Sequence, residues 1–240
     1  MTEEKIKEPS SLSLEGEKIS IENSNLKITV NTKGAFLTSI YLKDKKKELL
    51  TGGAISLYPE RKEEGVDFSG VNFTIKEKEE GKLVLFWEDV ERNVSVTNTI
   101  SLEQQGYHIL STIFIDSPNQ LSYRFILPAQ IGEKRDEERV VFYDSKLYRE
   151  KKEGVSSEYD SKARWMGVRE KKDFLLLLIP LDKVRKGFFA RDYFGFNTEK
   201  NRAGWLIYAG PQSYTYLRLA NNLVKKITGE DVQLTEPAEI

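Results

Sequence analysis

Apolar and polar residues alternate with a period of two along much of the chain. Leu26, Ile28 and Val30 are separated by polar residues, which is typical of a strand with one buried and one solvated face. The same pattern between Gly, Pro, Asn and charged turns predicts further strands at residues 36–42, 55–58, 71–76, 82–87, 94–102, 107–116, 123–127, 140–143, 164–168, 174–179 and 205–208. Many short strands in sequence favour stacked antiparallel sheets over a βαβ repeat.

One amphipathic helix is predicted near the C-terminus, at residues 213–227. Its apolar stripe includes Leu217 and Val224, and we expect this stripe to pack against the sheets. The opposite face is polar and is therefore available to partners; it carries Arg218, Asn222 and Lys225.

The chain divides into three parts on this reading. Residues 1–20 are charged and lack periodicity, so we predict a flexible linker there. Residues 21–229 form one β domain that includes the helix, and residues 230–240 form a tail. Two charged stretches, 132–139 and 149–162, are predicted to be loops at the rim of the sheets.

Charge and cysteine content exclude several classes of function. The 37 basic and 38 acidic residues are interleaved and give a net charge of -1, so no field attracts nucleic acid. Cysteine is absent, which removes disulfides and thiolate metal sites. The longest apolar run, Phe174–Ile179, ends at Pro180 and is too short to span a bilayer; it predicts a strand buried on both faces.

No catalytic residue is predicted from the sequence. His108 is the only histidine and lies in a strand-like run, with no adjacent residue that could hold its tautomer, so a structural or surface role is favoured. No glycine-rich phosphate loop occurs, and a single histidine without cysteine argues against a transition-metal site. The three tryptophans favour core packing over a cleft that stacks sugars. We therefore predict no catalytic, cofactor-binding or metal-ligating residue.

Three short motifs carry a resemblance to a known family. They are Asn31–Ala35 between two predicted strands, Trp165–Arg169 followed by Phe174–Pro180, and Tyr208–Pro211 before the predicted helix. In this order and at this spacing they resemble the large extracytoplasmic domain of the YidC family of bacterial membrane-protein insertases.

The resemblance implies both a fold and a function. The fold would be a two-sheet antiparallel β-supersandwich, galactose mutarotase-like, with the helix at its C-terminal end. The function would be that of a non-enzymatic domain supporting the insertion and folding of inner-membrane proteins, alone or with the Sec translocon. It would lie on the periplasmic face of the inner membrane, anchored by transmembrane segments outside this chain.

The implied partners are the membrane-embedded insertase core of the same full-length protein, Sec translocon components and nascent membrane proteins, with no small-molecule substrate or cofactor. The alternative is a mutarotase-like carbohydrate-binding protein or sugar epimerase. Catalysis of that type resembles a His acid working with a Glu base, usually beside a further histidine. The single His108 argues against that mechanism, so we expect no turnover of sugars.

Overall fold

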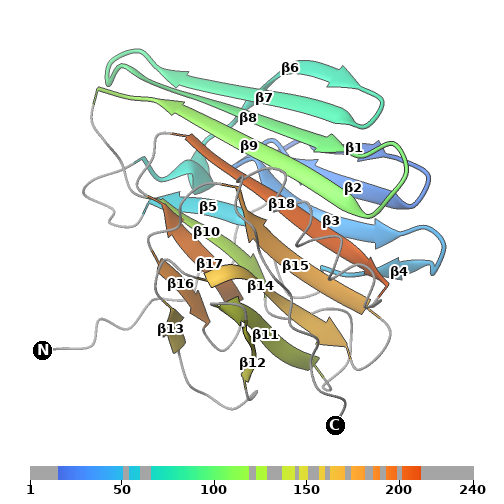
Figure 1. The fold of residues 1–240 in the computed structure, drawn as a ribbon. Coiled ribbons are helices and arrows are strands. Elements are labelled where there is room, and N and C mark those ends of the chain that lie inside the picture. The colour runs from blue at the N-terminus through green and yellow to red at the C-terminus, as the bar shows by residue number, and fades with distance from the viewer. Residues whose placement is uncertain are drawn as a thin grey trace, which may run out of the picture.

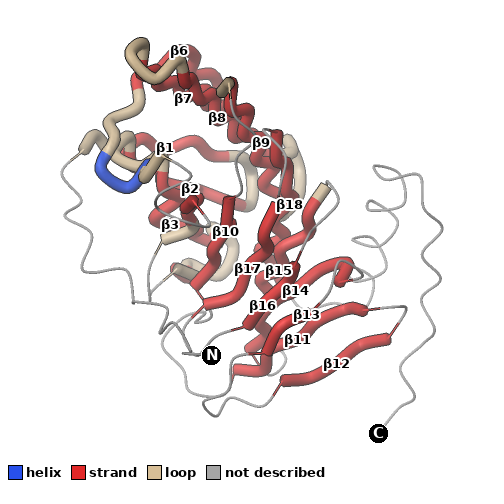
Figure 2. The backbone as a smooth tube through the Cα atoms, turned by 90° about the vertical axis from the view of Figure 1, so that its left-hand side faces the viewer, coloured by secondary structure: helices blue, strands red, loops and turns tan. Residues whose placement is uncertain are grey.

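The computed structural model describes residues 16–50, 54–59, 66–118, 123–128, 137–143, 146–150, 157–159, 163–170, 174–181, 186–189, 193–198 and 202–211. Most of these residues lie in strands, with one short helical turn, η1 (Phe68–Gly70), among them (Figure 2). The strands are β1 (Lys18–Glu22), β2 (Leu26–Asn31), β3 (Phe36–Leu42), β4 (Lys47–Glu48), β5 (Ser56–Pro59), β6 (Thr74–Glu79), β7 (Lys82–Asp89), β8 (Val94–Leu102), β9 (His108–Asp116), β10 (Tyr123–Pro128), β11 (Glu137–Tyr143), β12 (Lys146–Glu150), β13 (Ser157–Tyr159), β14 (Ala163–Glu170), β15 (Phe174–Pro180), β16 (Lys186–Phe189), β17 (Tyr193–Thr198) and β18 (Arg202–Pro211).

The strands form antiparallel sheets arranged in two layers (Figure 1). One layer is a nine-stranded sheet in the order β12-β11-β14-β15-β18-β9-β8-β7-β6. The other layer contains the sheets β1-β2-β3-β4 and β13-β16-β17-β10-β5, which an isolated bridge between Leu37 and Ile55 connects. The predicted fold class, a mainly β antiparallel sandwich of two layers, is confirmed.

Period-two alternation located most strands well. The predicted bounds of β3 and β8 match the observed strands, and the burial along β8 alternates as expected of a half-buried strand. The turn between β2 and β3 also forms as predicted, with Gly34 at a φ of +74° that a glycine adopts without strain. In β15, Leu175 to Ile179 are all buried, which confirms the strand buried on both faces.

Several boundaries and strands differ from the prediction. Strand β1 begins at Lys18, inside the segment assigned to the flexible linker 1–20, and Ile19 and Ile21 both point into the core. Strands β12, β13, β16 and β17 were not predicted. Most residues of β12 precede the second predicted loop, and β11 begins inside the first predicted loop. The predicted helix 213–227 and the tail 230–240 lie outside the described residues.

The phenol of Tyr123 is buried in the core between the layers. The side chain is 1% exposed and stacks on Phe68, with ring centroids 5.4 Å apart. Among the described residues the hydroxyl has no hydrogen-bond partner. Burial raises the pKa of Tyr123 to about 12, against a smaller lowering effect of the Val66 backbone.

The Tyr123→Phe variant should be less sensitive to alkaline pH than the wild-type protein. An unfolded tyrosine has a pKa of about 10, so the folded state holds this proton more tightly. The corresponding stabilisation is fully present below about pH 10 and is lost as the pH rises towards about 12. Urea unfolding of both proteins across this range measures the difference. Parallel losses of stability in the two proteins would contradict the assignment.

Candidate functional site

The outward face of the nine-stranded sheet is buried over some strands and open over others. On β9, Ile109, Ser111 and Ile113 point inwards and line a cavity between the layers, so His108, Leu110, Thr112 and Phe114 face outwards. The outward-facing Leu206 and Tyr208 of β18 are 4% and 1% exposed. On β9, by contrast, Leu110 is 37% and Phe114 is 51% exposed.

Strand register defines which side chains share this open region. Residues paired across an antiparallel ladder point to the same face. One row across β7, β8 and β9 is Phe86, Thr97 and Phe114, the next is Val84, Thr99 and Thr112, and the third is Lys82, Ser101 and Leu110. We call these nine residues the open face: Lys82, Val84, Phe86, Thr97, Thr99, Ser101, Leu110, Thr112 and Phe114. Lys82 is the charged residue among them and lies 2.5 Å from the carboxylate of Glu77.

His108 and Glu103 form a hydrogen-bonded pair at one end of the open face. The Nδ1 atom of His108 lies 2.6 Å from the Oε2 atom of Glu103. The His108 side chain is 17% exposed, and its ring lies beside that of Tyr208, with centroids 5.5 Å apart. Glu103 is the one hydrogen-bond partner of the His108 ring among the described residues. A carboxylate on Nδ1 fixes the tautomer and leaves Nε2 to act on a ligand.

The hairpin turn between β8 and β9 brings these two residues together. Its last residue before the tyrosine, Gly106, has a φ of +149°. A Cβ at this position would lie 2.6 Å from the Oε2 atom of Glu103, so only glycine leaves room for the carboxylate. The sequence therefore folds the glutamate back onto the histidine, five positions along the chain.

The turn between β1 and β2 holds this hairpin from the other layer. The Asn23 side-chain amide donates to the carbonyl oxygens of Glu103 at 2.6 Å and Gly106 at 3.3 Å. Its Oδ1 atom accepts hydrogen bonds from the backbone of Asn25 and Leu26. Because one side chain connects two turns, the position of Glu103 depends on the packing of the two layers.

Replacing Asn23 by alanine should destabilise the protein by about 1–3 kcal/mol, since several hydrogen bonds of about 0.5–1.5 kcal/mol are lost together. Asn23→Asp keeps both acceptor bonds and loses the two donor bonds, so it isolates the link to the β8–β9 turn. Thermal unfolding of the three proteins measures the ranking. Equal stability of wild type and Asn23→Ala would show that the side chain does not hold the hairpin.

The space between the two layers is too small for a sugar. The cavity there has a volume of about 30 Å³ and is lined by apolar residues together with Ser56, Asn98 and Ser111. Ligand pockets measure about 300–1,000 Å³, whereas this volume suits one or two water molecules. This cavity, which is formed by described residues, therefore cannot hold a sugar ring.

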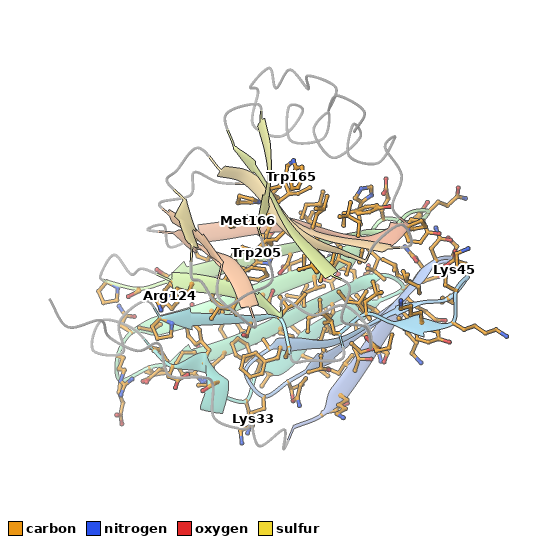
Figure 3. The ribbon with its side chains drawn as sticks, turned by 90° about the horizontal axis from the view of Figure 1, so that it is seen from below. Lys33, Lys45, Arg124, Trp165, Met166 and Trp205 are labelled. Atoms are coloured by element: carbon orange, nitrogen blue, oxygen red, sulfur yellow. The ribbon has the colours of Figure 1, made fainter. Side chains whose placement is uncertain are left out.

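The tryptophans take part in the core, as predicted. Trp165 and Trp205 are 2% and 4% exposed, and Trp87 packs against the same core. Figure 3 shows Trp165, Met166 and Trp205 among the strands of the fold, whereas Lys33 and Lys45 project from its edges. Phe114, which lies on the open face, is 51% exposed.

The sequence-based expectations for the site compare as follows. His108 lies in a strand as predicted, and its partner Glu103, which is not adjacent to it in the sequence, reaches it across the turn. The predicted partner-facing residues Arg218, Asn222 and Lys225 lie outside the described residues. Within the part of the chain that is described, no helix has the length and apolar character to cross a membrane.

The fold defines the class to which the molecule is similar: galactose mutarotase-like β-supersandwiches. A galactose mutarotase-like protein from Lactobacillus casei matches with a TM-score of 0.58 and 12% identity, over 82% of this chain and 100% of that chain. A galactose mutarotase related enzyme from Lactobacillus acidophilus matches with a TM-score of 0.56 and 10% identity, over 82% and 99% of the two chains.

A larger enzyme contains a similar fold. The α-galactosidase from Lactobacillus brevis matches with a TM-score of 0.56 and 6% identity, over 88% of this chain and 42% of that chain. No family model matches the sequence, and no curated protein matches it.

These similarities overturn the function predicted from the three motifs. The similar structures are named as mutarotase-like proteins and sugar enzymes, and they favour the alternative interpretation. The prediction of a non-enzymatic domain of a membrane-protein insertase is therefore corrected. Glu103 provides His108 with a carboxylate partner, whereas the sequence contains no second histidine.

Proposed function

We propose that the protein binds an aldose on the outward face of the nine-stranded sheet and interconverts its anomers. The observation that carries the proposal is the His108–Glu103 pair, with 2.6 Å between its atoms, at the end of the open face. The fold supports it, because solved structures of this fold include proteins named as a galactose mutarotase-like protein and a galactose mutarotase related enzyme.

The chemistry requires two proton transfers on the sugar. A base removes the proton from the hydroxyl on the anomeric carbon while the bond from that carbon to the ring oxygen breaks. The ring oxygen gains a proton, which gives the open-chain aldehyde, and closure on the other face of the carbonyl gives the second anomer. No oxidant or cofactor takes part in this sequence.

His108 can supply the base. With Nδ1–H donated to the Glu103 carboxylate, Nε2 carries the lone pair and accepts the proton from the anomeric hydroxyl. Glu103 then stabilises the imidazolium that forms. Water can protonate the ring oxygen, so one histidine is sufficient for the cycle. The ring of Tyr208 limits the orientation of the imidazole from one side.

The direct test is exchange NMR between the α and β anomers of D-galactose and D-glucose. We expect the full chain to increase the exchange rate in proportion to its concentration. Amide shifts in β9 should change on addition of sugar. An exchange rate equal to that of buffer would refute the enzymatic role, and unchanged amide shifts as well would refute sugar binding.

A further inference from the structure

The lining of the cavity between the two layers includes residues from both layers that carry polar side-chain atoms. They are Ser56 of β5 in one layer and Asn98 of β8, Ser111 of β9 and Trp205 of β18 in the other. Each of them is at most 7% exposed. Empty cavities in proteins are apolar, whereas polar cavities of sufficient size hold ordered water. The lining of this cavity is therefore that of a hydration site.

The indole nitrogen of Trp205 requires a hydrogen-bond acceptor. The Nε1 atom is buried, it can only donate, and among the described residues it has no partner. A buried donor without a partner costs the full desolvation of the group. Trp205 pairs with Ser111 across β18 and β9, so both side chains lie on the inward face of the sheet, beside the cavity. An acceptor inside the cavity would therefore satisfy the indole N–H.

The other polar groups suit a ligand that donates and accepts hydrogen bonds at the same time. The Ser111 hydroxyl donates to Oδ1 of Asn98 over a long distance of 3.4 Å. The hydroxyl oxygen keeps its lone pairs, and the amide nitrogen of Asn98 carries two donor hydrogens. Ser56 adds a second hydroxyl from the opposite layer. A buried water molecule makes about three hydrogen bonds, which these groups can supply together with Trp205.

The volume of the cavity, about 30 Å³, exceeds the space of about 10–15 Å³ that one water requires. We infer that the cavity is a binding site for internal water that accepts a hydrogen bond from Nε1 of Trp205. The same water connects Ser56 of one layer with Ser111 and Asn98 of the other. It is a structural ligand behind the hairpin that carries His108, and the inference does not depend on the proposed function.

NMR of the full chain tests the site at the indole proton of Trp205. We expect cross-peaks between this proton and water, with opposite signs in NOESY and ROESY spectra, because a bound water outlasts the tumbling of the protein. Trp165 is the internal control, since it is 2% exposed but does not line the cavity, and its indole proton should show no such cross-peak. Cross-peaks of equal sign at Trp205 would show direct exchange of its proton with solvent. That result, or no cross-peak at all, would overturn the inference.

Two variants at one position separate the water from the Ser111 hydroxyl, whose own proton exchanges with solvent. Ser111→Ala removes the hydroxyl, keeps the space and frees Oδ1 of Asn98, so the cross-peak at Trp205 should remain. Ser111→Val places two methyl groups in that space, so the cross-peak should disappear.

Ser95→Val is the matched control for the valine variant. Its neighbour Val96 lines the cavity, so Ser95 lies on the opposite face of β8, and the cross-peak at Trp205 should be unchanged. Circular dichroism verifies that each variant is folded. Loss of the cross-peak in Ser111→Ala would assign it to the hydroxyl, and its persistence in Ser111→Val would place the water outside the cavity. Either result would contradict the inference.

Discussion

Replacing His108 by asparagine should slow the exchange of aldose anomers by about 10²–10⁴-fold, the range that general acid–base catalysis contributes. Asparagine keeps a polar group of similar size near Glu103 but cannot accept the proton from the anomeric hydroxyl. The side chain is partly exposed and lies near the end of a strand, so the fold should tolerate the change. Exchange NMR of the purified variant gives the rate, and circular dichroism verifies that the protein is folded.

Glu103→Gln provides the graded comparison. Glutamine can still accept a hydrogen bond from Nδ1, but it has no negative charge to stabilise an imidazolium. We expect a smaller loss of rate than for His108→Asn, with little change in sugar affinity. Val90→Ala is the control, because Val90 is 82% exposed, and this variant should retain the full exchange rate. A His108→Asn protein with the wild-type exchange rate would remove His108 from the mechanism.

Replacing Gly167 by alanine should destabilise the protein by about 1–3 kcal/mol or more, because the new methyl group has no room. Gly167 in β14 pairs with Leu177 of β15. A Cβ there would collide with the carbonyl oxygen of Leu176 and would lie 2.5 Å from Cδ2 of Leu177. The carbonyl belongs to the backbone of a central strand, so the collision can be relieved only by displacing the strand.

Gly70→Ala is the matched control for this substitution. A Cβ at Gly70, in η1, would meet no atom within 4 Å. Its effect on the free energy of unfolding should stay within about 0.5 kcal/mol. Urea unfolding of the two variants gives the comparison. Similar stabilities for both would show that β14 and β15 have space for a methyl group between them.

The sequence predicted the fold where burial follows a simple period. Strands such as β8 have one inward and one outward face, so the alternation of apolar and polar residues predicts both the strand and the side that faces the core. Strand β1 was missed because Lys18 and Glu22 surround its two isoleucines and resemble the charged segment before it. Strands such as β17 contain glycine and adjacent aromatic residues, and these interrupt the alternation of apolar and polar residues that predicts a strand.

The candidate site depends on contacts that the sequence does not show directly. Glu103 lies between the strands predicted at residues 94–102 and 107–116 and is not adjacent to His108 in the chain. The signal that could have identified the pair is Gly106, which lies between the two residues and suits a tight turn. The support from Asn23 could not have been predicted, because it depends on how two separate sheets pack.

The pairing of β9 with β18 has a consequence for how activity returns after unfolding. Strands β6 to β9 are consecutive in the chain, so their hairpins can form early. His108 pairs with Tyr208, about a hundred positions later, and such distant contacts form slowly. The hairpin that carries Glu103 and His108 can therefore form before His108 pairs with Tyr208, the contact that orients it. During refolding, the proposed exchange of anomers should recover with the last kinetic phase and not with the first appearance of β structure.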